Sequence, residues 1–358
     1  MRALYFGTYE RDYPRNAQVI SCLRAAGVEV LEHHSALWEG QRHKLAFGPR
    51  VMARAALAEG RLVRRSADEA DVVLVGYPGH IDVPAARRVA RGRPVVFNPL
   101  VSLEDTIVSD RGLAQPRSLR ARMVGLVDRT AFRSVDLVVA DTAAHARFFG
   151  ERFEIPPDRL AVCFVGAEDH VFTPGPRREE PFHVLFVGKL IPLHGLETIL
   201  AAAALVPEVE FRVVGSGQLD ATMGARPTNV RWEAWVEYER LPDLYRSAGC
   251  ALGVFGTSDK AARVIPNKAF QALACGAPLV TADTPAAREL LTDGRDALLV
   301  PAGDADALAV AVRRLAGDRE LTDEIAARGR ETYVGRASEP VLGARWRALL
   351  EGLVNGRA

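Results

Sequence analysis

The amino-acid sequence predicts an α/β protein of two doubly wound parallel-sheet domains, and three observations support this class. Short runs of β-branched and other apolar residues alternate with amphipathic stretches along the chain. Most of these runs are continuously apolar rather than alternating, as expected of strands buried on both faces. The pattern stops once, at TPGPRREEP (residues 173–181), a segment of prolines and charges typical of a linker, and then starts again.

The first part of the chain accounts for one domain, over residues 1–172. Its predicted strands are, in order, ALYFG, VEVLEH, DVVLVGYP, RPVVFN, VDLVVAD and RLAVCFVG. Helical segments lie between them, for example over residues 14–26, 116–134 and 142–153. Repeated strand–helix–strand units with short connections predict a parallel sheet.

The second part repeats this organisation over residues 182–336. Its predicted strands are FHVLFVG, VEFRVVGSG, NVRW, CALGVFG, APLVTAD and DALLVP. Asp304 is placed to cap a helix that extends to Leu315. The terminal segment, residues 337–358, is expected to form a helix that packs back on the first domain.

Composition and charge exclude several classes of protein. The 358 residues carry a formal net charge of +1, whereas a nucleic-acid-binding protein usually has a basic domain. Four widely spaced cysteines, without a CxxC pair, favour free thiols in a reducing compartment over a metal site. No apolar run approaches the ~18 residues of a membrane span, and the chain opens with a strand, MRALYFG, rather than a signal peptide. We therefore expect a cytoplasmic protein that does not bind nucleic acid.

Ligands of open α/β sheets lie beyond the carboxyl ends of the strands, so the residues that follow the predicted strands are candidates for a site. One such loop, within KAARVIPNKAFQALACGAPLV (260–280), holds two of the four lysines of the chain. A cation in the first turn of a helix opposes the helix dipole unless an anion is bound there. A second candidate, VLFVGKLIPLHGLETIL (184–200), is a strand, a glycine turn and a helix start, which suits a phosphate. Solvated basic loops are the alternative for both.

These segments resemble a known family. GKLIPLHGLETIL is similar to the GR-L-x-P-x-KG-x-x-x-L segment, and VVGSGQL to the VGxGP turn, of retaining glycosyltransferases of the GT-B fold, glycosyltransferase family 4. IPNKAFQALACGAPLVTADTPAARELL resembles the PSKxxEAMAxGxPVVAxDxPAxxExx segment of the same family. The likeness covers residues 183–335, and in the first domain it is limited to LYFGTY and DLVVADTAAH.

The resemblance implies two Rossmann-like domains facing across a cleft, with a nucleotide-diphosphate sugar on the second and the acceptor on the first. Lys189 and His194 stand where the family has an arginine and a lysine on the diphosphate. Gln271 stands where a glutamate holds the ribose, and Arg263 where another glutamate touches the donor sugar. Two carboxylates are therefore missing, and one permanent cation is a titratable histidine.

A guanidinium has only hydrogen-bond donors, so Arg263 suits a phosphate or carboxylate rather than a sugar hydroxyl. We expect a cationic cradle that stabilises the leaving diphosphate without a metal or another cofactor. Asp304 and Asp306 resemble a metal-binding pair, but a helix cap explains them better. The expected donor-binding residues are Gly7, Thr8, Gly188, Lys189, His194, Gly195, Gly215, Lys260, Arg263, Asn267, Lys268 and Gln271.

Catalysis is expected from Lys189, Lys268 and Arg263, with two candidates in the first domain. His80 follows a strand and could contact the sugar or the acceptor, and a polar loop histidine is the alternative. Asp105 could accept the proton of the acceptor hydroxyl. Helix capping at this point, by Ser102, explains the same segment without catalysis.

The acceptor is open: a glycan, a lipid-linked sugar or a small molecule fits equally well. Residues 42–65 are rich in arginine and apolar residues, which predicts weak contact with anionic lipid or, alternatively, a solvated helix. A different class of function also remains, because two family carboxylates are absent. In that case the protein binds a nucleotide sugar as a regulator or scaffold without turnover.

Overall fold

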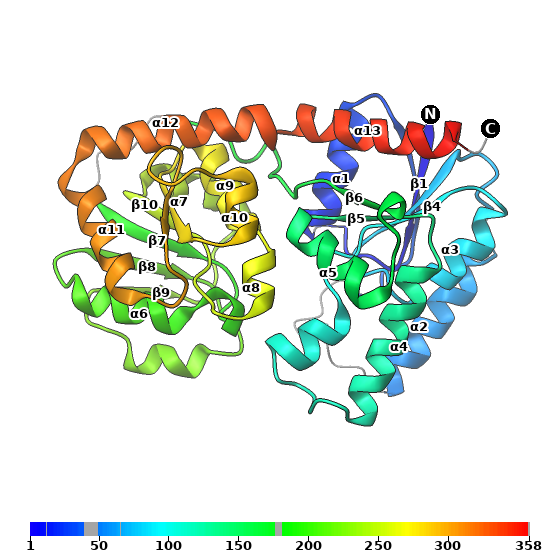
Figure 1. The fold of residues 1–358 in the computed structure, drawn as a ribbon, viewed down its shortest axis with the longest axis horizontal. Helices are drawn as coiled ribbons and strands as arrows, with labels where there is room; N and C mark the ends of the chain where they lie inside the picture. Colours follow the sequence, from blue (N-terminus) through cyan, green and yellow to red (C-terminus); the bar gives the residue numbers. More distant parts are fainter. Residues whose placement is uncertain (12, 39–48, 65, 176–180, 357–358) are drawn as a thin grey trace. The chain divides into compact units, whose positions relative to one another are not determined.

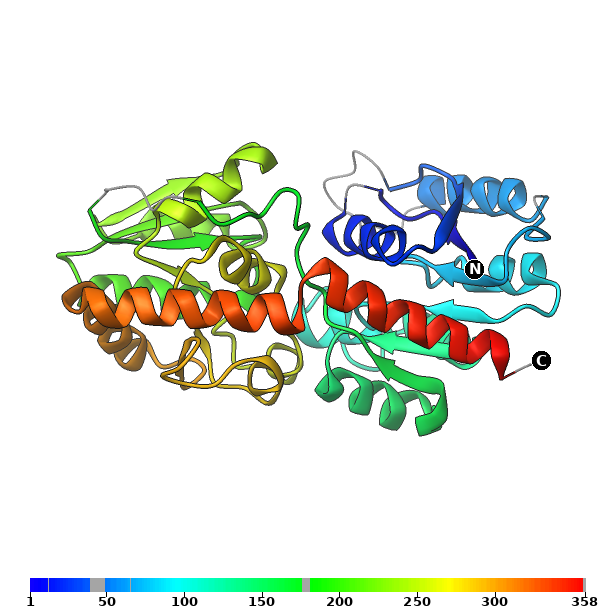
Figure 2. The ribbon, with the colours of Figure 1, turned by 90° about the horizontal axis from the view of Figure 1, so that it is seen from above.

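A computed structural model describes residues 1–11, 13–38, 49–64, 66–175 and 181–356. The chain divides into two compact units, Met1–Phe164 with Glu339–Ala358 (unit 1) and Val165–Ser338 (unit 2). Each unit contains a parallel sheet of six strands with helices on both faces (Figures 1 and 2). The predicted α/β class and its doubly wound sheets are confirmed.

Unit 1 has the strand order β2-β1-β3-β4-β5-β6. Strand β1 pairs with β2 on one side and with β3 on the other. The order in which the chain adds strands to the sheet therefore reverses at β1. The elements in chain order are β1 (Arg2–Gly7), α1 (Pro14–Ala25), β2 (Glu29–His34), α2 (Pro49–Leu62), β3 (Val72–Val75), α3 (Val83–Ala90), β4 (Val95–Phe97), η1 (Asp105–Asp110), α4 (Leu119–Arg133), β5 (Leu137–Ala140), α5 (Ala143–Phe153), η2 (Pro157–Arg159), β6 (Leu160–Val162) and α13 (Glu339–Asn355).

Unit 2 has the strand order β12-β11-β10-β7-β8-β9, and its direction reverses at β7. Its elements are β7 (His183–Val187), η3 (Pro192–His194), α6 (Leu196–Leu205), β8 (Glu210–Val214), η4 (Asp220–Ala225), β9 (Val230–Glu233), η5 (Tyr238–Arg240), α7 (Leu241–Ser247), β10 (Cys250–Leu252), α8 (Asp259–Arg263), α9 (Asn267–Cys275), β11 (Leu279–Ala282), α10 (Pro285–Leu290), β12 (Leu298–Val300), α11 (Ala305–Gly317) and α12 (Arg319–Arg336).

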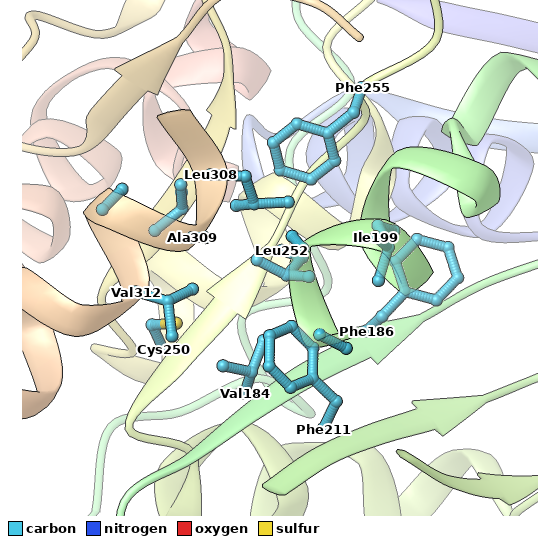
Figure 3. Packing of buried hydrophobic residues seen from close by; sticks show 14 of the residues in the cluster. Val184, Phe186, Ile199, Phe211, Cys250, Leu252, Phe255, Leu308, Ala309 and Val312 are labelled. Carbon is cyan, nitrogen blue, oxygen red and sulfur yellow. The ribbon is translucent and has the colours of Figure 1, made fainter. Parts of the chain in front are cut away.

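The continuously apolar strands are buried on both faces. In β1, Leu4 and Phe6 belong to one core cluster of unit 1, while Ala3 and Tyr5 belong to the cluster on the opposite face. In unit 2, apolar side chains of the central strands meet those of α6 and α11 (Figure 3). Each fully buried side chain of this size stabilises the fold by about 1.5–3 kcal/mol relative to an exposed one.

Helix α13 completes unit 1, although the whole of unit 2 precedes it in the sequence. It packs against α1, and the two helices are neighbours in both views of the ribbon (Figures 1 and 2). Trp346 of α13 is 0% exposed, and the buried guanidinium of Arg15 lies 5.9 Å from the centroid of its ring. Arg15 also donates to Asn98 Oδ1 and to the carbonyl oxygen of Phe164. This one side chain therefore links α1, α13 and the ends of two strands.

Local signals place the helix ends well, with small shifts. The helix expected over residues 116–134 begins at Leu119, because the Ser118 hydroxyl accepts a hydrogen bond from the Ala121 N–H. Asp304 caps α11 as predicted, since its carboxylate accepts from the Ala307 N–H. Much of the expected linker, 176–180, and residues 42–48 and 65 of the basic stretch lie outside the described residues.

The contact between α1 and α13 provides a first prediction. A Cβ atom at Gly343 would lie 2.4 Å from the carbonyl oxygen of Cys22, a backbone atom that cannot move aside. We expect Gly343→Ala to push α13 away from α1 and to lower the free energy of unfolding of unit 1 by about 1–3 kcal/mol. Thermal unfolding measures this effect.

The matched control is Gly352→Ala on the same helix. A Cβ atom at Gly352 would meet nothing within 4 Å. There the substitution should be neutral or stabilise by up to about 1 kcal/mol, because alanine favours the helix. Equal stability of the two variants would contradict close packing of α13 on α1.

Candidate functional site

The candidate site in unit 2 lies where the order of strands in the sheet reverses, at β7. Strand β7 pairs with β8 on one side and with β10 on the other, so the connections from β7 and β10 leave toward opposite sides. Such a reversal opens a crevice at the carboxyl ends of the strands, where doubly wound sheets bind their ligands. The segments at this crevice are the loop after β7, which starts at Gly188, and the loop after β10, residues 253–258.

Two glycines allow the ends of β7 and β8 to approach each other. Gly188 has φ +152° and Gly215 has φ +130°, both in a region that side chains rarely adopt. A Cβ atom at Gly215 would lie 2.0 Å from the carbonyl oxygen of Gly188, so no larger residue fits without moving the backbone. The Gly188 N–H donates to the carbonyl oxygen of Val214 at 2.9 Å. These glycines hold an open backbone turn at the strand ends.

The loops after β7 and β10 are also joined directly. The Phe255 N–H donates to the carbonyl oxygen of His194 at 3.1 Å. Gly195, which precedes α6 with φ +69°, has the Phe255 backbone 2.5 Å from the place of a Cβ atom. The first turn of α6, with its free N–H groups, is thereby fixed beside the turn at Gly188.

Lys268, in the first turn of α9, is the most unusual residue of this region. Its side chain is 5% exposed, and among the described residues Nζ has no hydrogen-bond partner. Nζ lies 4.1 Å from the centroid of the Phe186 ring and 2.7 Å from the place where a Cβ atom on Gly188 would be. Burial lowers the pKa of the Lys268 ammonium well below its usual range. The alternative of a solvated basic loop is therefore wrong for Lys268, whose side chain is buried under the glycine turn.

The remaining predicted cations lie on neighbouring segments. His194 Cε1 is 3.3 Å from the same Cβ position on Gly188, so His194 and Lys268 approach one point. Lys260 is buried on α8, and the adjacent Ala261 packs with Ile191 and Leu193 of the loop after β7. Two further predicted residues, Lys189 and Arg263, are exposed and partly exposed respectively. The structure thus brings Lys268, His194 and Gly188 together, with Lys260 and Arg263 on the short helix beside them.

Gln271 belongs to a buried polar chain that the sequence did not indicate. Its Oε1 accepts from the Tyr245 hydroxyl at 3.2 Å, and its Nε2 donates to the Tyr238 hydroxyl at 3.5 Å. Tyr238 in turn donates to Glu168 Oε2 at 2.9 Å. Glu168 is 5% exposed and raises the pKa of Tyr238, after the larger effect of burial. The position of Glu168 a few residues after β6 is the one signal that could have identified it.

In unit 1 the structure commits Gly7 and Thr8 to an internal contact. The Thr8 N–H and hydroxyl both donate to the Asp82 carboxylate, at 2.8 and 2.9 Å. Trp38 Nε1 donates to the Thr8 hydroxyl, and Thr8 is 0% exposed. A Cβ atom at Gly7 would lie 2.3 Å from Asp82 Oδ2. The need for glycine at this turn is therefore explained by Asp82 of the same unit.

The first-unit candidates for catalysis are buried too. His80 is 3% exposed, and its Nε2 lies 3.1 Å from the carbonyl oxygen of Val101 and 3.3 Å from Asp128 Oδ1. Burial lowers the pKa of His80, a larger effect than that of Asp128. Asp105 is 8% exposed, and its N–H donates to the Ser102 hydroxyl, which favours capping of this segment. Contact of either side chain with an acceptor remains a prediction.

The described residues contain neither a candidate metal site nor a candidate membrane-spanning helix. Those residues contain no group of three or more histidine, cysteine or acidic side chains that could hold a metal ion. No helix among them is long and apolar enough to cross a membrane. All four cysteines are buried, and none of them forms a disulfide.

Comparison with known protein sequences supports a site in unit 2. Residues 181–318 match a family model described as glycosyl transferases group 1. Over 286 residues the chain is 29% identical to the D-inositol 3-phosphate glycosyltransferase of Geodermatophilus obscurus. This match covers 68% of the chain and 61% of the relative, so the chain spans less than two thirds of that relative's length.

Solved structures with the same architecture were also found. Sucrose-phosphate synthase of Thermosynechococcus elongatus has a TM-score of 0.74 at 17% identity and covers 99% of both chains. The Anabaena protein Alr3699/HepE, solved in complex with UDP-glucose, has a TM-score of 0.70 at 17% identity and covers 98% of this chain and 99% of its own. At such identity the likeness shows the fold: the chain has the GT-B fold, as the sequence predicts.

The burial of Lys268 leads to a prediction about stability. Methionine has a similar length without the charge, so Lys268→Met should remove the desolvation cost and keep the contact with Phe186. We expect the melting temperature of the unliganded protein at neutral pH to rise by roughly 2–4 °C. Differential scanning calorimetry measures it.

The lowered pKa of Lys268 also predicts how the stability of the folded chain changes with pH. The pKa of Lys268 is lower in the folded chain than the ~10.4 of an unfolded lysine, so the unfolded state binds more protons. The wild type should therefore gain stability relative to Lys268→Met as the pH rises from the depressed pKa toward ~10.4. Lys189→Met, at an exposed position, should show neither effect. Parallel stability curves for the wild type and Lys268→Met would contradict a desolvated ammonium.

Proposed function

We propose that the protein is a retaining glycosyltransferase of family 4, which transfers a sugar from a nucleotide-diphosphate sugar to an acceptor hydroxyl without a metal ion. The observation that carries this proposal is the ammonium of Lys268, buried without an acceptor under the glycine turn at the reversal of the unit 2 sheet. The match of residues 181–318 to the glycosyl transferases group 1 model supports the reaction class. The complex of the Anabaena protein with UDP-glucose supports the class of donor.

A diphosphate would relieve the local electrostatic cost of Lys268. A buried ammonium without an acceptor is strongly disfavoured, and a phosphate oxygen supplies both the opposite charge and the missing hydrogen bond. A Cβ atom on Gly188 would lie 2.7 Å from Nζ, so glycine is the residue that lets the ammonium lie directly against this turn. The N–H groups at the start of α6 add donors of the same polarity. The site is therefore complementary to an anion.

The same contacts act on the leaving group. When the bond between the anomeric carbon and the diphosphate oxygen breaks, negative charge grows on that oxygen. Fixed donors that meet this charge stabilise the transition state more than the ground state, and they do so without reorganisation. In this proposal Lys268 and Lys189 contact the diphosphate, with His194, Lys260 and Arg263 at its margin.

The acceptor is proposed to bind to unit 1, in the cytoplasm. A carbohydrate or a lipid-linked sugar is the expected acceptor class, and His80 and Asp105 stay the candidates for contact with it. Because both side chains are buried, this role requires local opening of the segments that cover them. Gly7 and Thr8 are proposed to lie beside the diphosphate through their backbone, since the Thr8 hydroxyl is already bound to Asp82.

A second candidate function is binding of a nucleotide sugar without turnover. It is favoured by Gln271, whose amide is held by Tyr245 and Tyr238 at the position where the family has a ribose-binding carboxylate. Arg263, in place of the second missing carboxylate, favours it as well. Turnover separates the two functions, because only the first forms a glycosylated product.

Binding of UDP tests the cradle. Lys268→Met should weaken UDP binding by about 1.5–3 kcal/mol, the range of a hydrogen bond to a charged group. Binding should also transfer a proton to the wild-type lysine, because the bound phosphate restores its charged form. Calorimetry at pH 8 in two buffers of different ionisation enthalpy measures both quantities.

The controls separate the cradle from general electrostatics. Arg231→Gln removes an exposed cation of β9 and should leave UDP affinity and proton uptake unchanged. Lys268→Met should lose the proton uptake, and its affinity should not fall with rising pH as that of the wild type does. If Lys268→Met binds UDP as tightly as the wild type, the diphosphate lies elsewhere.

The reaction itself is tested by product analysis. Incubation with a panel of nucleotide sugars and acceptors should give a product whose anomeric configuration, measured by NMR, equals that of the donor. Activity should persist in excess chelator, because the cations of the chain take the part of a divalent ion. Inversion would refute retention, and loss of activity that magnesium or manganese restores would refute metal independence.

A further inference from the structure

Helix α4 (Leu119–Arg133) of unit 1 is apolar on two opposite sides. Its inner side, which includes Ala121, Val124 and Phe132, is buried against the unit. Its outer side carries Leu119, Met123 and Leu126, which are 75%, 59% and 65% exposed. The spacing i, i+4, i+7 places these three side chains in one stripe along about two turns. A helix at the surface of a protein usually carries polar residues on this side.

The charge around the stripe has one sign. Residues 111–133 contain six arginines and a single acidic residue, Asp128, which is 0% exposed. Asp128 is used inside the unit, where it accepts from the Ser102 hydroxyl and the Leu103 N–H. Arg120 and Arg122 lie on either side of the stripe, and both are exposed. The outer side of α4 is therefore apolar along its middle and cationic along both edges.

The loop before α4 extends this surface. Leu113 is 44% exposed, and Arg120 donates to its carbonyl oxygen at 3.1 Å. This hydrogen bond holds the loop against the first turn of α4. Two acids from other segments lie against α4. The Glu104 carboxylate, which pairs with Arg152, is 3.3 Å from the place of a Cβ atom on Gly125. Glu154 pairs with Arg129 and Arg133 at the C-terminal end of the helix.

We propose that this outer side of α4, formed by Leu113, Leu119, Arg120, Arg122, Met123 and Leu126, docks on an anionic membrane surface. The three apolar side chains of the stripe enter the boundary between headgroups and acyl chains. Arg120 and Arg122 contact lipid phosphates on either side. Each arginine is attracted to an anionic leaflet, and salt weakens this attraction. The helix lies in the interface and does not span it.

A membrane fits this surface better than a second copy of the chain. Two copies that pair through the same surface would bring their arginines together, because a two-fold interface repeats each patch on both partners. A leaflet of anionic lipids supplies the opposite charge along both edges at once. The proposal does not depend on sugar transfer, although it would place unit 1 at a lipid-linked acceptor. It also differs from a lipid contact through residues 42–65, where Leu57 is the large exposed apolar residue among the side chains of α2 that the structure describes.

Vesicle flotation with the full chain tests the proposal. We expect binding to vesicles that contain about one third phosphatidylglycerol, weak binding to phosphatidylcholine alone, and a decrease with salt. Leu119→Ser/Met123→Ser/Leu126→Ser should lower the partition coefficient by roughly tenfold or more. Arg120→Gln/Arg122→Gln should lower it and reduce its salt dependence. UDP binding should match the wild type in both variants. Thermal unfolding should match it in the stripe variant, because its side chains are exposed, whereas the arginine variant loses the hydrogen bond from Arg120 to the Leu113 carbonyl oxygen.

The control removes exposed apolar residues of similar size elsewhere. Val310→Ser/Val334→Ser, on α11 and α12 of unit 2, should bind vesicles like the wild type. Equal binding of the stripe variant and this control would overturn the proposal. So would a selective loss in Arg54→Gln/Arg61→Gln, which would assign the contact to α2. A concentration-dependent dimer in light scattering, abolished by the stripe variant, would show that a second copy covers α4.

Discussion

The candidate site depends on one close approach, that of the Gly188 and Gly215 turns at the ends of neighbouring strands. Neither position tolerates a Cβ atom, so the two backbones come within contact distance. Lys268 extends from α9 to the Gly188 turn and rests on the Phe186 ring. The ammonium is thus placed by packing, and among the described residues no acidic side chain is hydrogen-bonded to it. A buried cation placed in this way favours an anion.

Much of the fold could be predicted from the sequence, because strands buried on both faces and helices with polar caps leave local patterns. The segments that form the site could also be predicted, because ligands of such sheets lie beyond the carboxyl ends of the strands, and the order of elements along the chain shows which segments follow those ends. Local patterns do not show which distant side chains meet. A lysine in a first turn looks solvated until Gly188 and Phe186, about 80 residues earlier, are seen to cover it.

In unit 1, residues that the sequence suggests as ligand-binding are instead used for contacts inside the unit. Thr8 and His80 follow strands, as ligand-binding residues do, yet Asp82 and Asp128 use them for internal contacts. Gln271 was identified by resemblance, but its chain through Tyr238 to Glu168 was not. In each case the deciding partner lies far away in the sequence. Pairwise contacts of buried polar groups are a property of the tertiary structure.

The return of α13 to unit 1 has a consequence for biosynthesis. Unit 2 is continuous, Val165–Ser338, whereas unit 1 consists of the first 164 residues and the last helix. Domains fold as they emerge from the ribosome, so unit 2 can close on its own sequence while the other still lacks α13. Until Trp346 arrives, α1 presents an uncovered apolar side and the buried guanidinium of Arg15 lacks its aromatic neighbour. Residues 1–164 thus leave the exit tunnel before unit 2 but reach their native state after it. A nascent chain arrested before residue 339 is therefore the form most in need of a chaperone.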